Sequence, residues 1–115
     1  MIYESTRDIN RKINPSEAIL QGLSEEGGLF VLRDLGKNKL DFKNLVGKNY
    51  YEVAEEVLKL FVDFSEQEIK ACVKNAYKGK FSNEKITPLV ELNDSYVLEL
   101  FNGPTSAFKD VGLSL

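Results

Sequence analysis

The chain has 115 residues, 43% hydrophobic and 29% charged, the balance of an ordinary globular protein. Its net charge of −3 comes from 15 basic and 18 acidic side chains, with no basic stripe to bind nucleic acid and no apolar run long enough to span a membrane. The absence of histidine excludes a Ser-His-Asp triad and histidine-ligated metals; one cysteine, Cys72, and no signal-peptide pattern fit a reducing cytoplasm.

The first elements along the chain are predicted to be a strand and a capped helix. Residues 2–4 are assigned to a short strand. Asn14 is a good helix cap, Pro15 fits the first helical position, and Glu17 follows in the third. Gly22 is a typical stop, so we expect this helix to end there.

A turn, a strand and a loop are predicted next. The pair Gly27-Gly28 predicts a turn because glycine readily adopts positive φ, and the apolar run 29–32 predicts a strand. Residues 33–48 are rich in Lys, Asn and Gly and are assigned to a loop. A second helix is predicted to begin at Asn49 with Glu52 as its capping partner, since apolar residues then recur at helical spacing.

The third helix is predicted to begin at Ser65, where Glu68 completes a Ser-x-x-Glu capping box, and to end at Gly79. Because the link between the second and third helices is short, we expect an antiparallel pair. The buried stripe of the third helix is predicted to contain four residues: Ile69, Cys72, Val73 and Ala76.

The pattern changes after Lys80, where we predict a domain boundary. Residues 87–90 are expected to be extended, because a residue before proline avoids the helical region, and residues 95–101 read as a strand. Residues 102–104 (Asn-Gly-Pro) break that strand, and residues 106–115 are predicted to open a helix.

The predicted fold therefore has two parts. Residues 1–80 form an α+β domain with a helical pair, and residues 81–115 form the first strand, turn and helix of an α/β layer. The chain ends before further strands could complete that layer, so we expect residues 81–115 to be its truncated start. Periodicity alone leaves open a small α+β domain with a helical C-terminus.

Lys109 is the main candidate for chemistry. A strand leads into a turn of small residues, and the turn places the lysine in the first turn of a helix, where backbone N–H groups gather. That positive helix end, together with burial by Phe108 and Val111, would favour the neutral amine. A neutral amine is what an aldehyde cofactor needs to form an imine, and the hydroxyls of Thr105 and Ser106 lie close in sequence.

Other interpretations of this segment compete with the catalytic one. Most lysines early in a helix are solvated surface residues. A phosphate-binding loop does not fit, because Gly103 lies too far before the lysine and Asp110 stands where Ser or Thr is required. There is no Gly-x-Gly-x-x-Gly sequence to support a dinucleotide-binding fold.

Four segments carry a family resemblance. Residues 98–110, LELFNGPTSAFKD, resemble the sequence of threonine synthases around the lysine that binds pyridoxal phosphate (PLP). Residues 3–7 resemble that family's Tyr-x-Ser-Thr-Arg, residues 18–31 its glycine-rich block, and residues 50–54 its Ser-Tyr-x-Glu-Ala helix. The segments follow the family order and cover most of the chain. The sequence differs from the family pattern at Asn102, where a histidine is usual, and at four other positions: Asp8, Glu25, Glu26 and Leu32.

The resemblance implies the fold-type-II PLP architecture and a synthase that converts O-phospho-L-homoserine to L-threonine and phosphate. Lys109 would hold PLP as a Schiff base and then transfer protons. Thr105 and Ser106 would contact cofactor or substrate, although turn and capping roles suit Thr105 better. Arg7 would face the substrate phosphate, although a role in fixing the N-terminal strand is the simpler interpretation.

The resemblance also implies that the chain is the N-terminal piece of a longer cytoplasmic enzyme and stops just after its PLP lysine. Alone, such a fragment is expected to be inactive, and its open sheet edge would favour self-association. Two alternatives remain: another fold-type-II PLP enzyme, such as a dehydratase or sulfhydrylase, and an independent interaction module without chemistry.

Overall fold

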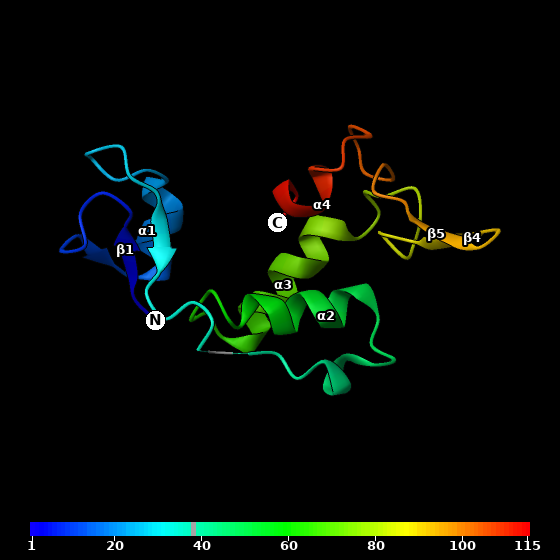
Figure 1. The fold of residues 1–115 in the computed structure, drawn as a ribbon, viewed down its shortest axis with the longest axis horizontal. Helices are drawn as coiled ribbons and strands as arrows, with labels where there is room; N and C mark the ends of the chain where they lie inside the picture. Colours follow the sequence, from blue (N-terminus) through cyan, green and yellow to red (C-terminus); the bar gives the residue numbers. More distant parts are fainter. Residues whose placement is uncertain (38) are drawn as a thin grey trace.

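The computed structural model describes residues 1–37 and 39–115, which form an elongated molecule of 51 × 31 × 31 Å (Figure 1). The radius of gyration is 16.5 Å, whereas a compact domain of this length has one of about 13 Å. The accessible surface is 8362 Å², against about 6,300 Å² for a compact monomer of this mass. The chain therefore leaves more surface open than a self-contained domain of its size.

The N-terminal part is a small antiparallel sheet. Strand β1 (Tyr3–Ser5) lies between β2 (Lys12–Ile13) and β3 (Phe30–Leu32). The strands predicted at residues 2–4 and 29–32 are confirmed to within one residue. Strand β2 was not predicted, because two residues are too few to show an alternating pattern.

Helix α1 (Pro15–Gln21) follows β2 and begins and ends as predicted. The Asn14 side chain accepts a hydrogen bond from the backbone N–H of Glu17, and the Glu17 carboxylate accepts one from the backbone N–H of Asn14. Gly22 ends the helix with φ 74°, a left-handed angle that suits glycine.

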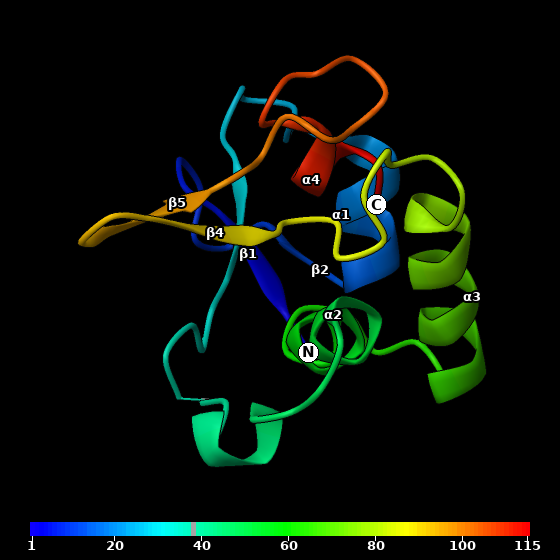
Figure 2. The same ribbon diagram turned by 90° about the vertical axis from the view of Figure 1, so that its right-hand side faces the viewer.

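Helices α2 (Tyr50–Leu58) and α3 (Glu66–Tyr77) also carry the predicted capping boxes, one at Asn49 and one at Ser65. The prediction of an antiparallel pair is wrong. In Figure 2 helix α2 is seen end-on while α3 runs across the view, so the two helices cross steeply. The connection 59–65 makes two further turns after α2 and redirects the chain before α3 begins.

The main core lies where α3 meets α2 and the segment that follows α3. Cys72 was expected in the buried stripe of α3, but its side chain is exposed. The stripe is centred on Ile69 and Val73 and continues on the far side into Tyr77, which leaves Cys72 on the flank. The six buried residues of this core are Val62, Ile69, Val73, Ala76, Tyr77 and Ile86.

The C-terminal part consists of a hairpin, a loop and a short helix. Strands β4 (Leu89–Leu92) and β5 (Ser95–Leu98) pair with each other, and the hairpin projects from the body in both views (Figures 1 and 2). Helix α4 (Asp110–Leu113) is shorter than the helix predicted over 106–115. Strand β5, a turn and α4 follow one another, and the prediction that they begin a larger α/β layer stays a prediction.

The predicted loop 33–48 contains one turn of 3-10 helix, η1 (Phe42–Leu45), whose first turn is capped by the Asp41 side chain. The division near Lys80 stays a prediction: Ile86, beyond it, packs into the same core as α3. No helix in the described part of the chain is long and apolar enough to cross a membrane.

Candidate functional site

The loop between β5 and α4 carries Lys109 and is closed by one side-chain contact. Asp110, the first residue of α4, is only 8% exposed. Its carboxylate accepts two hydrogen bonds from Thr105: one from the backbone N–H at 2.7 Å and one from the hydroxyl at 2.6 Å. Lys109 therefore lies directly beside the residue that fixes the loop.

Small residues let this loop fold tightly around Asp110. A Cβ atom added to Gly103 would overlap the Asp110 side chain, so the close approach requires glycine there. Ser106 adopts φ 59°, an uncommon angle for a residue with a side chain, and its N–H donates to the Gly103 carbonyl at 3.1 Å. The turn brings Thr105 into direct hydrogen-bonding contact with Asp110.

Lys109 itself is exposed and lies just before α4, as its N-cap, rather than in its first turn. The burial expected from Phe108 is not present, because that side chain is 65% exposed. Within residues 1–37 and 39–115, no carboxylate forms an ion pair with Lys109. The amine is therefore open to a reagent from solvent.

Two contacts tie this loop to the rest of the chain. The Tyr77 hydroxyl donates to the Val111 carbonyl at 2.8 Å, which joins α3 to α4. Asn102, which stands where the family pattern has histidine, is buried; its backbone carbonyl accepts from the Ser82 N–H at 2.9 Å and its side-chain oxygen from the Ser82 hydroxyl at 3.1 Å. The Asn102 side-chain NH2 has no hydrogen-bond partner among the described residues.

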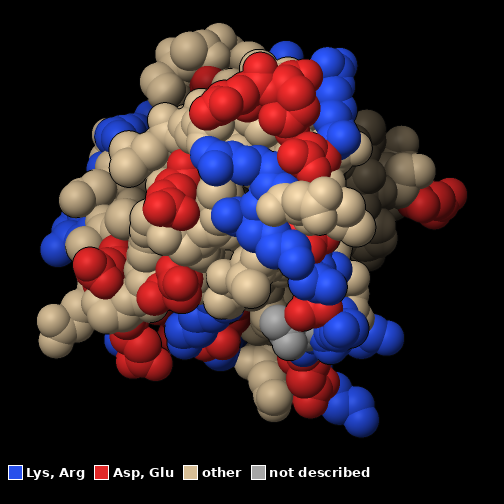
Figure 3. Space-filling model, turned by 90° about the vertical axis from the view of Figure 1, so that its left-hand side faces the viewer, with Lys and Arg blue, Asp and Glu red and all other residues tan. Residues whose placement is uncertain are grey.

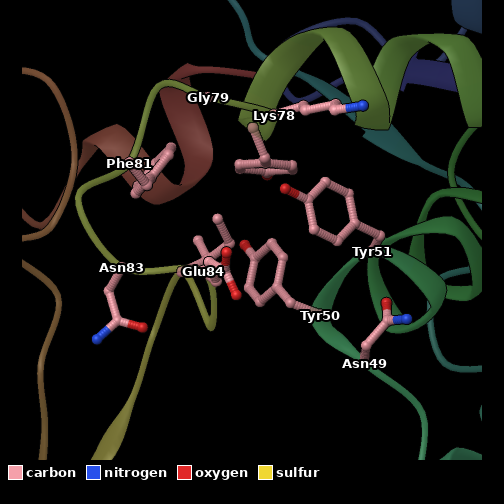
Figure 4. A pocket seen from close by; sticks show the side chains of 10 residues that line it. Asn49, Tyr50, Tyr51, Lys78, Gly79, Phe81, Asn83 and Glu84 are labelled. Carbon is pink, nitrogen blue, oxygen red and sulfur yellow. The ribbon is translucent and has the colours of Figure 1, made fainter.

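An aromatic pocket of about 600 Å³ lies between α2 and the segment after α3 (Figure 4). Tyr50 and Tyr51 point from α2 toward that segment, and the Tyr50 and Tyr77 rings meet edge to face with centroids 4.9 Å apart. The pKa of the Tyr50 hydroxyl is raised, mainly by burial and to a smaller extent by the neighbouring Tyr77. Tyr50 is therefore protonated at neutral pH. None of the residues predicted for chemistry lines this pocket, and its tyrosines belong to the core packing.

A second polar cluster joins strand β1 to the turn that precedes β3. The hydroxyls of Ser5 and Ser24 lie 2.9 Å apart and both donate to one carboxylate oxygen of Glu26. The Ser24 hydroxyl also accepts the backbone N–H of Gly28 at 3.1 Å. A Cβ atom at Gly28 would overlap the Ser5 hydroxyl, so this glycine is required for its lack of a side chain.

Arg7 belongs to this cluster. Its guanidinium donates to the Glu26 carbonyl at 2.9 Å and its backbone N–H donates to the Ser5 hydroxyl at 3.2 Å. The side chain is exposed. On the face of the molecule in Figure 3, basic and acidic groups are mixed. Strand β1, which precedes Arg7, and helix α4, which follows Lys109, lie well apart (Figure 1). The structure therefore shows Arg7 in contact with Ser5 and Glu26 and does not bring it to Lys109, and its contact with substrate stays a prediction.

The sequence did not single out three residues that form these sites: Asp110 as the acceptor for Thr105, and Ser24 and Glu26 as partners of Ser5. Contacts between side chains across a loop leave no periodic signal in a single sequence. No group of three or more His, Cys, Asp or Glu side chains in the described part of the chain is arranged to hold a metal ion.

Comparisons with known proteins support one family. Residues 2–77 match the family model described as the threonine synthase N terminus. The chain is 38% identical over its full length to a threonine synthase of Pseudomonas aeruginosa and 39% identical, over 96% of its length, to one of Schizosaccharomyces pombe. It covers 25% and 22% of those proteins.

A solved structure shares both sequence and fold with the chain. A PLP-bound threonine synthase from Brucella melitensis superposes with a TM-score of 0.83 and 38% identity. The match covers 96% of this chain and 24% of that one, so the chain spans about a quarter of the relatives that it matches.

The serine–glutamate cluster generates a prediction about acid stability. The hydrogen bond from Ser5, followed by that from Ser24, lowers the pKa of the Glu26 carboxyl below its usual value of 4.5. A carboxyl whose pKa is lowered by folding adds stability above the unfolded pKa, and that contribution is lost as the pH falls through the folded value. We expect Glu26→Gln to lower stability near pH 7, and its difference from the parent to shrink as the pH falls below the usual value of 4.5.

Denaturant unfolding at several pH values from 7 to 3 measures this difference. Glu25→Gln removes the same charge one residue away and is the matched control. A difference between Glu26→Gln and the parent that stays constant over the whole pH range would contradict the assignment.

Proposed function

The chain belongs to the threonine synthase family, and from that premise we propose that its complete protein converts O-phospho-L-homoserine and water to L-threonine and phosphate. The observation that supports this most directly is the exposed amine of Lys109 at the end of a loop closed by Asp110. That loop lies within a chain whose whole length is similar to a threonine synthase.

We propose PLP as the cofactor, attached covalently to the Nζ atom of Lys109. The residues of the loop fit this role: Lys109 offers an accessible primary amine, and the neighbouring Ser106 hydroxyl is exposed. When bound, PLP supplies an electron sink for the charge that develops on the substrate. Lys109 would hold the cofactor and carry protons at Nζ, and Ser106 would be the polar contact to the cofactor.

The roles proposed for Thr105 and Arg7 follow from their contacts. The Thr105 hydroxyl already donates to Asp110, so we assign it to the loop rather than to the cofactor. One guanidinium nitrogen of Arg7 donates to the Glu26 carbonyl, and its other N–H groups are the only ones left for a substrate phosphate. We therefore propose a contact to substrate only as a second role of Arg7.

We also propose a larger context for the C-terminal part. Residues 81–115 would be the first strand, turn and helix of a fold-type-II PLP domain, and residues 1–80 the N-terminal domain. The complete enzyme would act on its small-molecule substrate in the cytoplasm. The chain is 38% identical in sequence to a threonine synthase whose structure was solved with PLP bound, and this similarity supports the proposed arrangement.

The central prediction concerns Lys109 in the complete reading frame of the gene. With PLP and O-phosphohomoserine, we expect phosphate and threonine to form together, and Lys109→Ala to abolish PLP attachment and lower the rate by at least about 10²- to 10⁴-fold. Borohydride reduction followed by peptide mass spectrometry locates the attached PLP. Lys85→Ala, which removes another exposed lysine, should behave like the parent.

The outcomes separate the alternatives. PLP attachment at Lys109 without either product would indicate another PLP enzyme, and Asn102 would then be the first residue to examine. Products that persist in Lys109→Ala would contradict the assigned role of this lysine.

A second prediction concerns the 115-residue chain by itself. We expect no threonine formation, because the segment that it matches is about a quarter of a threonine synthase. The same assay of the purified chain, with the complete protein as a positive control, tests this. Threonine release above the level of a boiled sample would contradict it.

A third prediction concerns association of the same short chain. Every residue of β4 and β5 is exposed, and the outer edges of a hairpin offer unpaired N–H and C=O groups. We propose that copies associate through this hairpin, and that Val97→Lys shifts sedimentation at high concentration toward monomer. Leu35→Lys, which changes an exposed leucine in a loop, is the control. A parent chain that stays monomeric at every concentration would count against the proposal.

A further inference from the structure

The loop that carries Lys109 is held by hydrogen bonds within itself, two from Thr105 to Asp110 and one from Ser106 to Gly103. We propose that the contact between Thr105 and Asp110, here called the loop latch, positions Lys109 for its cofactor. Thr105 and Asp110 are then positioning residues, and neither needs to touch the reacting atoms. This inference rests on the function proposed above, and it gives the contact between Thr105 and Asp110 a role in cofactor attachment that the proposed function does not assign.

In the latch, both oxygens of one buried carboxylate accept a hydrogen bond. Asp110 is 8% exposed, and each of its two oxygens accepts one hydrogen bond from Thr105, at 2.7 and 2.6 Å. A buried carboxylate requires such donors, because leaving either oxygen unpaired costs desolvation energy. In the structure the loop is closed in this way, with Thr105 against the start of α4.

The surrounding residues are shaped around the same carboxylate. Gly103 leaves the space that Asp110 fills, and any side chain there would overlap it. Ser106 adopts a left-handed φ of 59° that turns the chain back between the two partners. A strained angle of this kind persists when the contacts around it determine the conformation.

The latch acts on Lys109 through the backbone. Lys109 precedes Asp110, so fixing Asp110 fixes the backbone from which the lysine side chain extends. One residue further on, the Val111 carbonyl accepts a hydrogen bond from the Tyr77 hydroxyl at 2.8 Å. Both contacts fix the backbone directly after Lys109, while the lysine side chain itself stays exposed.

Two variants of one residue test the hydroxyl half of the latch in the complete protein. Thr105→Val keeps the shape and removes the hydroxyl donor, which leaves one Asp110 oxygen unpaired. We expect it to weaken PLP attachment about 5- to 100-fold. Thr105→Ser keeps the hydroxyl and should restore attachment to nearly the parent level. The rate and the visible absorbance of PLP attachment are followed by stopped-flow spectroscopy.

A second readout needs no cofactor. Hydrogen–deuterium exchange of the protein without PLP should show faster exchange of residues 103–113 in Thr105→Val, and parent-like exchange elsewhere. A merely structural loss would instead lower the melting temperature and leave the attachment rate of the folded protein unchanged. Should Thr105→Val fail to fold, Asp110→Asn, which retains the size of the side chain, replaces it.

The outcomes distinguish the latch from the proposed function. If the parent attaches no PLP, the proposed function fails, and the positioning role fails with it. If the parent attaches PLP and Thr105→Val matches it in rate and absorbance, the latch is overturned and the function stands. Equal damage in Thr105→Ser and Thr105→Val would also overturn it, because the hydroxyl would not be the group that matters.

Discussion

The contacts of the Tyr77 side chain hold α2, α3 and α4 together, and the rest of the structure depends on them. Its ring lies in the main core, 3% exposed, and meets the rings of Tyr50 and Phe81. Its hydroxyl cannot remain unpaired inside a core, and it donates to the Val111 carbonyl at the start of α4. One residue thus joins α2, α3 and the loop that carries Lys109. The position of the candidate lysine is therefore coupled to the packing of the helical pair.

The two polar clusters share a physical design. In each, a glycine clears the space beside a hydroxyl or a carboxylate: Gly28 beside Ser5, and Gly103 beside Asp110. In each, one acidic side chain accepts from hydroxyl groups that come from a turn or a strand end. This explains why the family-like segments mix glycine with Ser, Thr and acidic residues. These residues stabilise the backbone conformation through contacts with one another, and only some of their polar groups are free to contact a ligand.

The extent to which the sequence predicted the structure follows from the range of each interaction. The three capping boxes were predictable, because Asn14, Asn49 and Ser65 each act on a glutamate three residues later. The steep crossing of α2 and α3 was not, since it depends on turns in the linker and on a core shared with Ile86. The sequence singled out Lys109 only as a candidate, and its exposure and the pairing of Thr105 with Asp110 depend on the path of the loop.

The distribution of exposed apolar side chains bears on how the site is built. Large apolar residues of the hairpin and of the loop before Lys109 are open to solvent, Phe101 and Phe108 among them. Burial therefore supplies little of the order in this part of the described chain. The loop latch needs no burial beyond its own carboxylate, because its donors come from Thr105, five residues away. The backbone at Lys109 is thus fixed by these local hydrogen bonds together with the Tyr77–Val111 contact, while the exposed apolar neighbours contribute little. A fixed backbone is what an exposed amine requires if it is to meet a cofactor in one orientation.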